Sequence, residues 1–285
     1  MRALADFIMA GRLKAALVAL LGNFLPLVSP AAVGLVVLRQ GLSEGCLVLL
    51  WAVLPLVLLV NAGNMNSAMV WASILSVLVV LIGASALKQT RSWKSTLKVM
   101  LGVSVLSGLA MKLVLAAEVS AMRETLIEML RQLQQQGNTL TFEPSDLFIA
   151  GLLAWVIALT AVAALLLARW WQSLLYNPGG FGVEFHALRF DRFSASVLFA
   201  ALMGCYLLGQ EYVTWGNLVG FPLLLSGIAL VHHSIAFAKL GTRWLVVFYM
   251  GLVLLLGPLS SVLIGLGFLD SVMDFRSRLA ARRSS

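Results

Sequence analysis

Lys112 is the residue whose position is least expected, because it is a basic side chain inside an apolar run. A charge at that depth in a membrane helix costs about 3 kcal/mol, so such residues often serve a function. Ser104, Gly108 and Lys112 are spaced by four and share one helix face. Either Lys112 points with Ser104 into a helix bundle and contacts a substrate, or its ammonium group extends to the lipid headgroups.

Two adjacent histidines, His232 and His233, stand near the end of another apolar run. Histidine titrates near neutral pH, so His233 could contact a ligand or relay a proton. The alternative is a hydrogen bond from the imidazole to a backbone carbonyl. Asn23 lies in a proline-containing run, where backbone groups freed by the prolines can line a cavity. The candidate substrate-binding residues are therefore Lys112, His233, Asn23 and Ser104.

Residues 169–193 form the longest connection of mixed polarity. The Asn-Pro-Gly-Gly sequence at 177–180 predicts a turn, because proline fixes one φ and glycine admits positive φ. We expect an interfacial loop that either rests on the membrane or docks a partner or substrate. Its candidate interaction residues are Trp171, Asn177, Pro178, Gly179, Gly180, Phe181, Glu184 and Arg189.

Asp270 and Asp274 are spaced by four near the end of the chain, and Arg278 continues the same helix face. A pair of carboxylates could serve catalysis or bind a cation. The simpler interpretation is a salt-linked helix end, since an Asp–Arg pair at this spacing stabilises a helix slightly. The candidate C-terminal motif comprises Asp270, Asp274 and Arg276.

Recognisable catalytic and cofactor motifs are lacking. The sequence has no Walker, dinucleotide-binding or His-Glu zinc motif, and no Gly-Xaa-Ser-Xaa-Gly turn. Cys46 and Cys205 both lie in apolar surroundings, as small buried hydrophobic residues do. We therefore expect a protein that is not an enzyme and that has no cofactor, metal site or disulfide framework.

The elements that position these residues follow from composition. The chain is 61% hydrophobic and 11% charged, with a mean hydropathy of +0.97. A bilayer core needs about 20 apolar residues in helical form. We expect an all-α membrane helix bundle, a single domain over 1–285, with an amphipathic extramembrane helix at 118–137. Eight spans are expected, at about 14–38, 46–60, 67–87, 99–117, 147–168, 194–209, 218–237 and 244–269.

Prolines are expected to kink the first and last spans. Pro26 and Pro30 lie in the first, and Gly257-Pro258 interrupts the last. The alternative is that one of these broken stretches is re-entrant, which would change the number of crossings from even to odd. Paired breaks at the two ends of a chain often mark a binding site in transporters.

The net charge of +8 comes from basic residues scattered among the ends of the spans. That distribution suits lipid headgroups, so the expected partner is the lipid bilayer and not nucleic acid. No cleavable leader is expected. Positive charges divide almost equally between the two sides. We place both termini in the cytoplasm because the first basic cluster of a membrane protein often sets its orientation and the C-terminal tail is also basic. The basic loop at 88–98 favours the opposite orientation.

Three stretches carry a family resemblance: the 171–189 segment with Asn177-Pro178-Gly179-Gly180-Phe181, the closing Gly267-Phe268-Leu269-Asp270 and Asp274-Phe275-Arg276, and the proline-rich first span. The sequence resembles the YybS-like family of bacterial inner-membrane proteins, which implies a bacterial inner-membrane location but no activity. It is more distantly similar to substrate-binding subunits of energy-coupling-factor vitamin transporters and to MreD-type rod-shape proteins. In those transporter subunits small residues spaced by four contact a partner, as Ala15 and Ala19 are spaced here.

The sequence therefore predicts a non-enzymatic membrane protein that binds or transports a small or lipid-like substrate. The alternative is a membrane scaffold that recruits partner proteins in envelope growth. A membrane enzyme ranks third, because no nucleophile–base pair is evident.

Overall fold

The computed structural model describes residues 1–25, 27–62, 67–136 and 142–278, and every regular element in these ranges is a helix. Lipid offers the backbone no hydrogen-bond partners, so apolar chain of this kind must bond to itself. The α-helices are α1 (Arg2–Met9), α2 (Arg12–Leu21), α3 (Val28–Arg39), α4 (Leu42–Ala62), α5 (Ser67–Thr90), α6 (Trp93–Val114), α7 (Ala116–Gln135), α8 (Asp146–Tyr176), α9 (Gly180–His186), α10 (Arg192–Leu207), α11 (Val213–Phe237), α12 (Arg243–Leu254) and α13 (Leu256–Met273). Two short 3-10 helices, η1 (Gly22–Phe24) and η2 (Gln210–Tyr212), precede α3 and α11.

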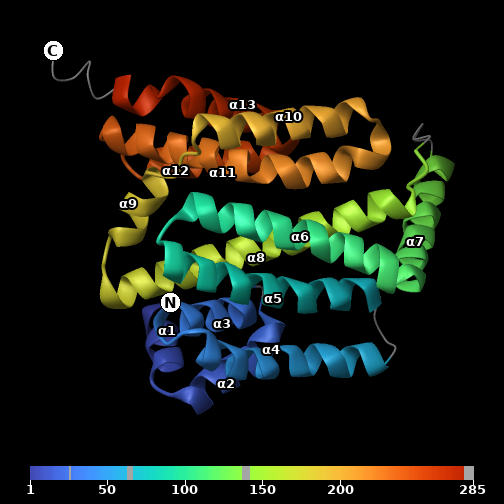
Figure 1. Ribbon diagram of the computed structural model, residues 1–285, viewed down its shortest axis with the longest axis horizontal. Coiled ribbons are helices and arrows are strands. Elements are labelled where there is room, and N and C mark those ends of the chain that lie inside the picture. Colours follow the sequence, from blue (N-terminus) through green and yellow to red (C-terminus); the bar gives the residue numbers. More distant parts are fainter. Residues whose placement is uncertain (26, 63–66, 137–141, 279–285) are drawn as a thin grey trace. The chain divides into compact units, whose positions relative to one another are not determined.

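Among the described residues, six helical segments are long and apolar enough to cross a membrane. They contain α4, α5, α6, α8, α13, and η2 together with α11 (Figure 1). Three further apolar helices, α3, α10 and α12, have 10–17 residues each. The prediction of an all-helical fold is confirmed for the described residues, and six segments, against the eight predicted, have the length and apolar character of membrane spans.

The chain divides into two compact units. Unit 1 comprises residues 1–178 and 205–218, and unit 2 comprises residues 179–204 and 219–285. Within unit 1, α8 contacts α3, α5 and α6, and Figure 1 shows it running among them. Leu153, Ile157 and Leu165 of α8 are fully buried there. The core of unit 1 is therefore built around one long central helix.

Small residues bring α6 and α8 together. Gly108 of α6 lies so close to α8 that a Cβ on it would be 2.6 Å from the Ala154 Cβ and 2.8 Å from the Ala150 carbonyl oxygen. Close approach of this kind lets two helices gain dispersion contacts where lipid gives no hydrophobic advantage. Ser104, one turn earlier, is also fully buried. The face predicted from the spacing of Ser104 and Gly108 is thus a helix-packing face.

The first predicted span is divided in the structure. The α2 helix ends at Leu21 and α3 begins at Val28, with η1 between them. Pro30 lies in the first turn of α3, where a missing N–H costs little. Pro26 lies outside the described residues. Likewise α12 ends at Leu254 and α13 begins at Leu256, so Gly257-Pro258 lies in the first turn of α13.

The predicted interfacial loop at 169–193 is mostly helical. The α8 helix continues to Tyr176, since nothing before Asn177-Pro178 disfavours a helix. With 31 residues it is about 46 Å long, which exceeds a hydrocarbon core of about 30 Å. After the turn at 177–179, α9 occupies Gly180–His186. The predicted amphipathic helix at 118–137 corresponds to α7, Ala116–Gln135.

Within unit 2, α11 and α13 pack closely. A Cβ on Gly267 would be 2.3 Å from the Leu223 carbonyl oxygen, so no larger residue fits there without displacing backbone. On another side of α13 the rings of Phe199 and Phe268 stack with their centroids 4.3 Å apart. These contacts fix α13 against α10 and α11 and so place its C-terminal end.

The α6–α8 contact yields a stability prediction. Gly108→Ala should lower the free energy of unfolding by about 1–3 kcal/mol, because the added methyl group meets Ala154 and backbone that cannot move aside. Gly102→Ala, in the same helix but with open space at its Cβ, is the control and should be neutral or slightly stabilising. Denaturant titration in detergent micelles measures both. Equal effects of the two substitutions would contradict this account of α6 packing.

Candidate functional site

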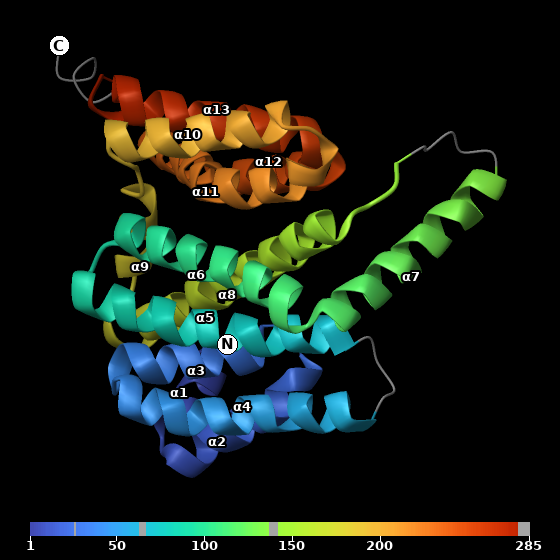
Figure 2. The ribbon, with the colours of Figure 1, turned by 45° about the vertical axis from the view of Figure 1, so that its right-hand side comes forward.

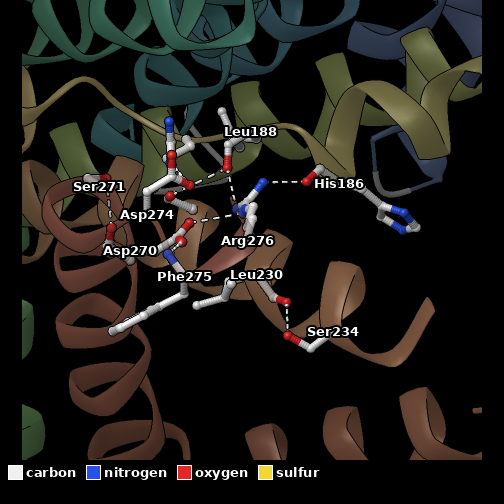
Figure 3. Close-up of polar contacts among 12 residues, drawn as sticks. His186, Leu188, Leu230, Ser234, Asp270, Ser271, Asp274, Phe275 and Arg276 are labelled. Carbon is white, nitrogen blue, oxygen red and sulfur yellow. Dashed lines mark hydrogen bonds and ion pairs between the residues drawn. The ribbon is translucent and has the colours of Figure 1, made fainter. Parts of the chain in front are cut away.

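Three segments of unit 2 meet around one arginine. They are α9 with the linker that follows it, the end of α11, and the end of α13 (Figure 3). Arg276, two residues beyond the C-cap of α13, donates from Nη1 to the His186 carbonyl oxygen and from Nη2 to the Leu188 carbonyl oxygen, the latter at 2.8 Å. Its Nε lies 2.9 Å from Oδ2 of Asp270. A planar guanidinium can serve several acceptors at once, so Arg276 ties the linker to α13.

The Asp270–Arg276 ion pair is buried. The Asp270 side chain is 0% exposed and that of Arg276 11% exposed. A buried carboxylate is tolerated only when it is paired and hydrogen-bonded. The second oxygen of Asp270 accepts a hydrogen bond from the Phe275 backbone N–H at 3.1 Å. The chain turns back toward Asp270 because Asp274 adopts the left-handed conformation (φ 54°) that ends α13, and aspartate is one of the residues that tolerate it.

An open cleft of about 490 Å³ adjoins this pair. We call it the terminal cleft. Two arginines, one aspartate and two histidines line it together with two small apolar residues: Arg189, Arg276, Asp274, His186, His233, Val183 and Ala187. Its lining thus combines positive, negative and apolar groups in one small volume.

The charge states in the cleft follow from its contacts. Arg189 pairs with Asp274. Partial burial raises the pKa of Asp274, but hydrogen bonds from Ser277 and the charge of Arg189 outweigh it and lower the pKa overall, so this carboxyl is ionised at neutral pH. Burial and the nearby Arg276 lower the pKa of His186, so its imidazole is neutral at pH 7. Arg189 and Arg276 carry two positive charges. Asp274, and Asp270 behind Arg276, carry two negative charges, so the charges balance.

His232 belongs to an adjoining aromatic cluster. Its Nε2 lies 2.8 Å from the Tyr249 hydroxyl oxygen, a hydrogen bond between α11 and α12. The His232 ring also meets Phe185 edge-on, with centroids 5.3 Å apart, and lies 6.0 Å from the His186 ring. All three histidines of the chain therefore gather in unit 2.

The candidate residues separate into two groups. The structure brings His233, Arg189, Asp274 and Arg276 to the terminal cleft, with Asp270 directly behind it. The sequence had placed these residues in three unrelated groups. Nothing in the spacing indicates that α9, α11 and α13 end together.

The other substrate-binding candidates lie in unit 1. Asn23 donates to the carbonyl oxygens of Ala19, Leu20 and Ala52, at 3.1–3.2 Å, and so holds the end of α2 to α4. Ser104 is fully buried within α6. Lys112 is partly exposed in the last turn of α6. These three residues do not form one site.

The remaining interaction-loop residues are spread along the chain. Trp171 is fully buried in α8, within unit 1, which leaves it unavailable to an outside partner. Asn177, Pro178 and Gly179 form an exposed turn, and Gly179 has φ 85°, as expected for a glycine turn. Gly180, Phe181 and Glu184 are half-buried in α9.

Sequence reasoning missed His186 and the linker carbonyls. His186 lies only five residues beyond the motif singled out at 177–181, and its rarity in this chain was the available signal. The carbonyl groups of His186 and Leu188 have no sequence signature at all. Within the described residues, no group of three or more His, Cys, Asp or Glu side chains is arranged to hold a metal ion.

The buried ion pair predicts a contrast between two substitutions. Asp270→Asn should lower the free energy of unfolding by about 3–5 kcal/mol, because it leaves the guanidinium of Arg276 buried without its counter-charge. Asp274→Asn breaks a pair whose carboxylate is 41% exposed and should cost no more than about 1 kcal/mol. Denaturant titration of the purified protein in micelles compares them. A larger loss for Asp274→Asn would contradict the assignment of Arg276 and Asp270 as the structural pair.

Comparison with known proteins leaves the site to be interpreted from its own chemistry. No family model, curated protein or solved structure matches this chain.

Proposed function

We propose that this chain is a multi-pass membrane protein whose unit 2 binds a small lipid-like molecule, with the charged headgroup of that molecule in the terminal cleft. The observation that carries the proposal is the position of the cleft at the ends of two candidate spans. The α13 span ends at Met273, directly before Asp274, and the α11 span ends at Phe237, one turn after His233. Charged groups at the end of a span lie at the level of lipid headgroups.

The lining of the cleft favours a headgroup that carries both signs of charge. Arg189 and Arg276 offer guanidinium N–H groups, which suit a phosphate. Asp274 is partly exposed and can accept hydrogen bonds from an ammonium group. Because the positive and negative side chains balance, a zwitterionic phosphate–amine headgroup matches the cleft better than a purely anionic one.

The same proposal includes the finer features expected from the sequence. The protein lies in a bacterial inner membrane with both termini in the cytoplasm, and its predicted first and last spans are each broken into two helices. It is a YybS-like protein and not an enzyme, and it transports the molecule that it binds. Support for crossings beyond the six long segments comes from the apolar character of the shorter helices α10 and α12.

The proposed topology predicts which side each connection faces. An alkaline-phosphatase fusion at Thr90 should be inactive, because this connection lies on the same side of the membrane as the N-terminal segment. Support for that placement is that Lys88 donates to the Arg39 carbonyl oxygen at 3.3 Å and that Arg12 pairs with Glu44. A fusion at Gln135, one span later, should be active. Assays of phosphatase activity in intact bacteria read both. The opposite pattern would reverse the orientation, and equal activities would contradict a crossing by α6.

Binding in the terminal cleft predicts a lipid-dependent stability. A short-chain phosphatidylethanolamine should raise the melting temperature of the purified protein more than the matching diacylglycerol, which lacks the headgroup. Ala187→Trp should abolish the difference by filling the cleft, and Arg189→Gln should reduce it by removing a phosphate ligand. Ala238→Trp, at an exposed position that does not line the cleft, is the control and should retain it.

Two results would argue against binding. An equal response to both lipids would exclude headgroup recognition, and an unchanged response of Ala187→Trp would place any recognition elsewhere. If no lipid stabilises the protein and the exposed turn at 177–179 cross-links to another membrane protein, the alternative of a scaffold for envelope growth is favoured.

A further inference from the structure

Helix α7 carries an apolar stripe along its length. Val119, Met122, Leu126 and Met129 recur at spacings of three and four and therefore share one face. Glu124, Glu128 and Arg131 occupy the opposite face and are exposed. Helices with separated faces of this kind lie at a boundary between a polar and an apolar medium.

Protein covers only the beginning of this stripe. Val119 is the one buried residue of α7, all of whose residues are described. Met122 and Leu126 are half-buried, and Met129 is 58% exposed. Figure 2 shows α7 leaving the bundle of unit 1 at a marked angle to α6. The stripe thus starts against unit 1 and continues beyond it on the same side.

Helix α7 is attached to the ends of two candidate spans, which fixes its depth relative to the membrane. It begins at Ala116, two residues after α6 ends at Val114. Its second turn is held to the first residue of α8 by an ion pair, with Arg123 Nη1 3.3 Å from Asp146 Oδ1. Both attachments lie where a membrane-crossing segment meets water. A helix attached where two candidate spans end can place an apolar stripe on the bilayer surface.

We infer that α7 lies in the membrane–water interface as a lipid-contacting helix, with the Met122–Leu126–Met129 stripe immersed among the upper acyl chains. The occupant of the stripe is the bilayer surface itself. The charges on α7 comprise three acids (Glu118, Glu124, Glu128) and two bases (Arg123, Arg131). The helix therefore binds the bilayer through its apolar side chains and does not require anionic lipid.

Spin labels on the full-length protein test this placement. Cysteines are introduced singly at Leu126 and Met129 on the stripe, and at Glu124 and Arg131 on the polar face as matched controls. Cys46 and Cys205 are first replaced by alanine. The protein is reconstituted into phosphatidylcholine vesicles, with and without phosphatidylglycerol. Collision rates with oxygen, which concentrates in lipid, and with a water-soluble nickel chelate are measured by electron paramagnetic resonance.

The inference predicts an oxygen-to-nickel collision ratio several-fold higher at Leu126→Cys and Met129→Cys than at the two controls, unchanged by phosphatidylglycerol. Similar ratios on both faces, with strong nickel collisions throughout, would place α7 in water and overturn it. Immobile labels at Leu126→Cys and Met129→Cys that neither reagent reaches would show that a protein surface, from a second copy or a partner, covers the stripe. That result also overturns the inference.

Discussion

The absence of hydrogen-bond partners in lipid is the constraint from which this structure follows. It forces the apolar chain into helices, because only a helix satisfies its own backbone within one segment. It also moves ionisable side chains to the ends of the helices, where water or an opposite charge is available. Asp270 shows how strict the constraint is. It is fully buried in the last turn of α13, where Arg276 supplies the opposite charge and the Phe275 N–H donates a hydrogen bond to one of its oxygens.

Packing between the helices relies on small residues. Gly108 lets α6 approach α8 in unit 1, and Gly267 lets α13 approach α11 in unit 2. The position of the terminal cleft depends on the second contact, because it sets where α13 ends relative to His233. Arg276 then attaches that helix end to the 186–188 linker by donating hydrogen bonds to its carbonyl groups. A structural ion pair and a candidate binding cleft thus share one arginine.

Much of the fold could be predicted from hydropathy, because a span needs only length and apolar character. The segment expected at 67–87 is α5, and the amphipathic helix at 118–137 is α7. Local features were harder to predict. Pro30 and Pro258 looked like interior breaks, yet each lies in a first turn, since η1 and the non-helical residue Leu255 provide the interruptions. The site was not predictable as a unit. Arg276 and His186 are 90 residues apart, and their contact runs through a backbone carbonyl that any residue type supplies.

The central claim is that the six long apolar segments cross a lipid bilayer and that charged residues gather at their ends. Hydrogen–deuterium exchange of the protein in lipid nanodiscs tests it most directly. Backbone amides within α4, α5, α6, α8, α11 and α13 should stay protected for hours, while those of the 177–179 and 239–242 connections exchange within seconds. Rapid exchange through the middle of these helices, or a chain that stays dispersed in water without detergent or lipid, would contradict the account.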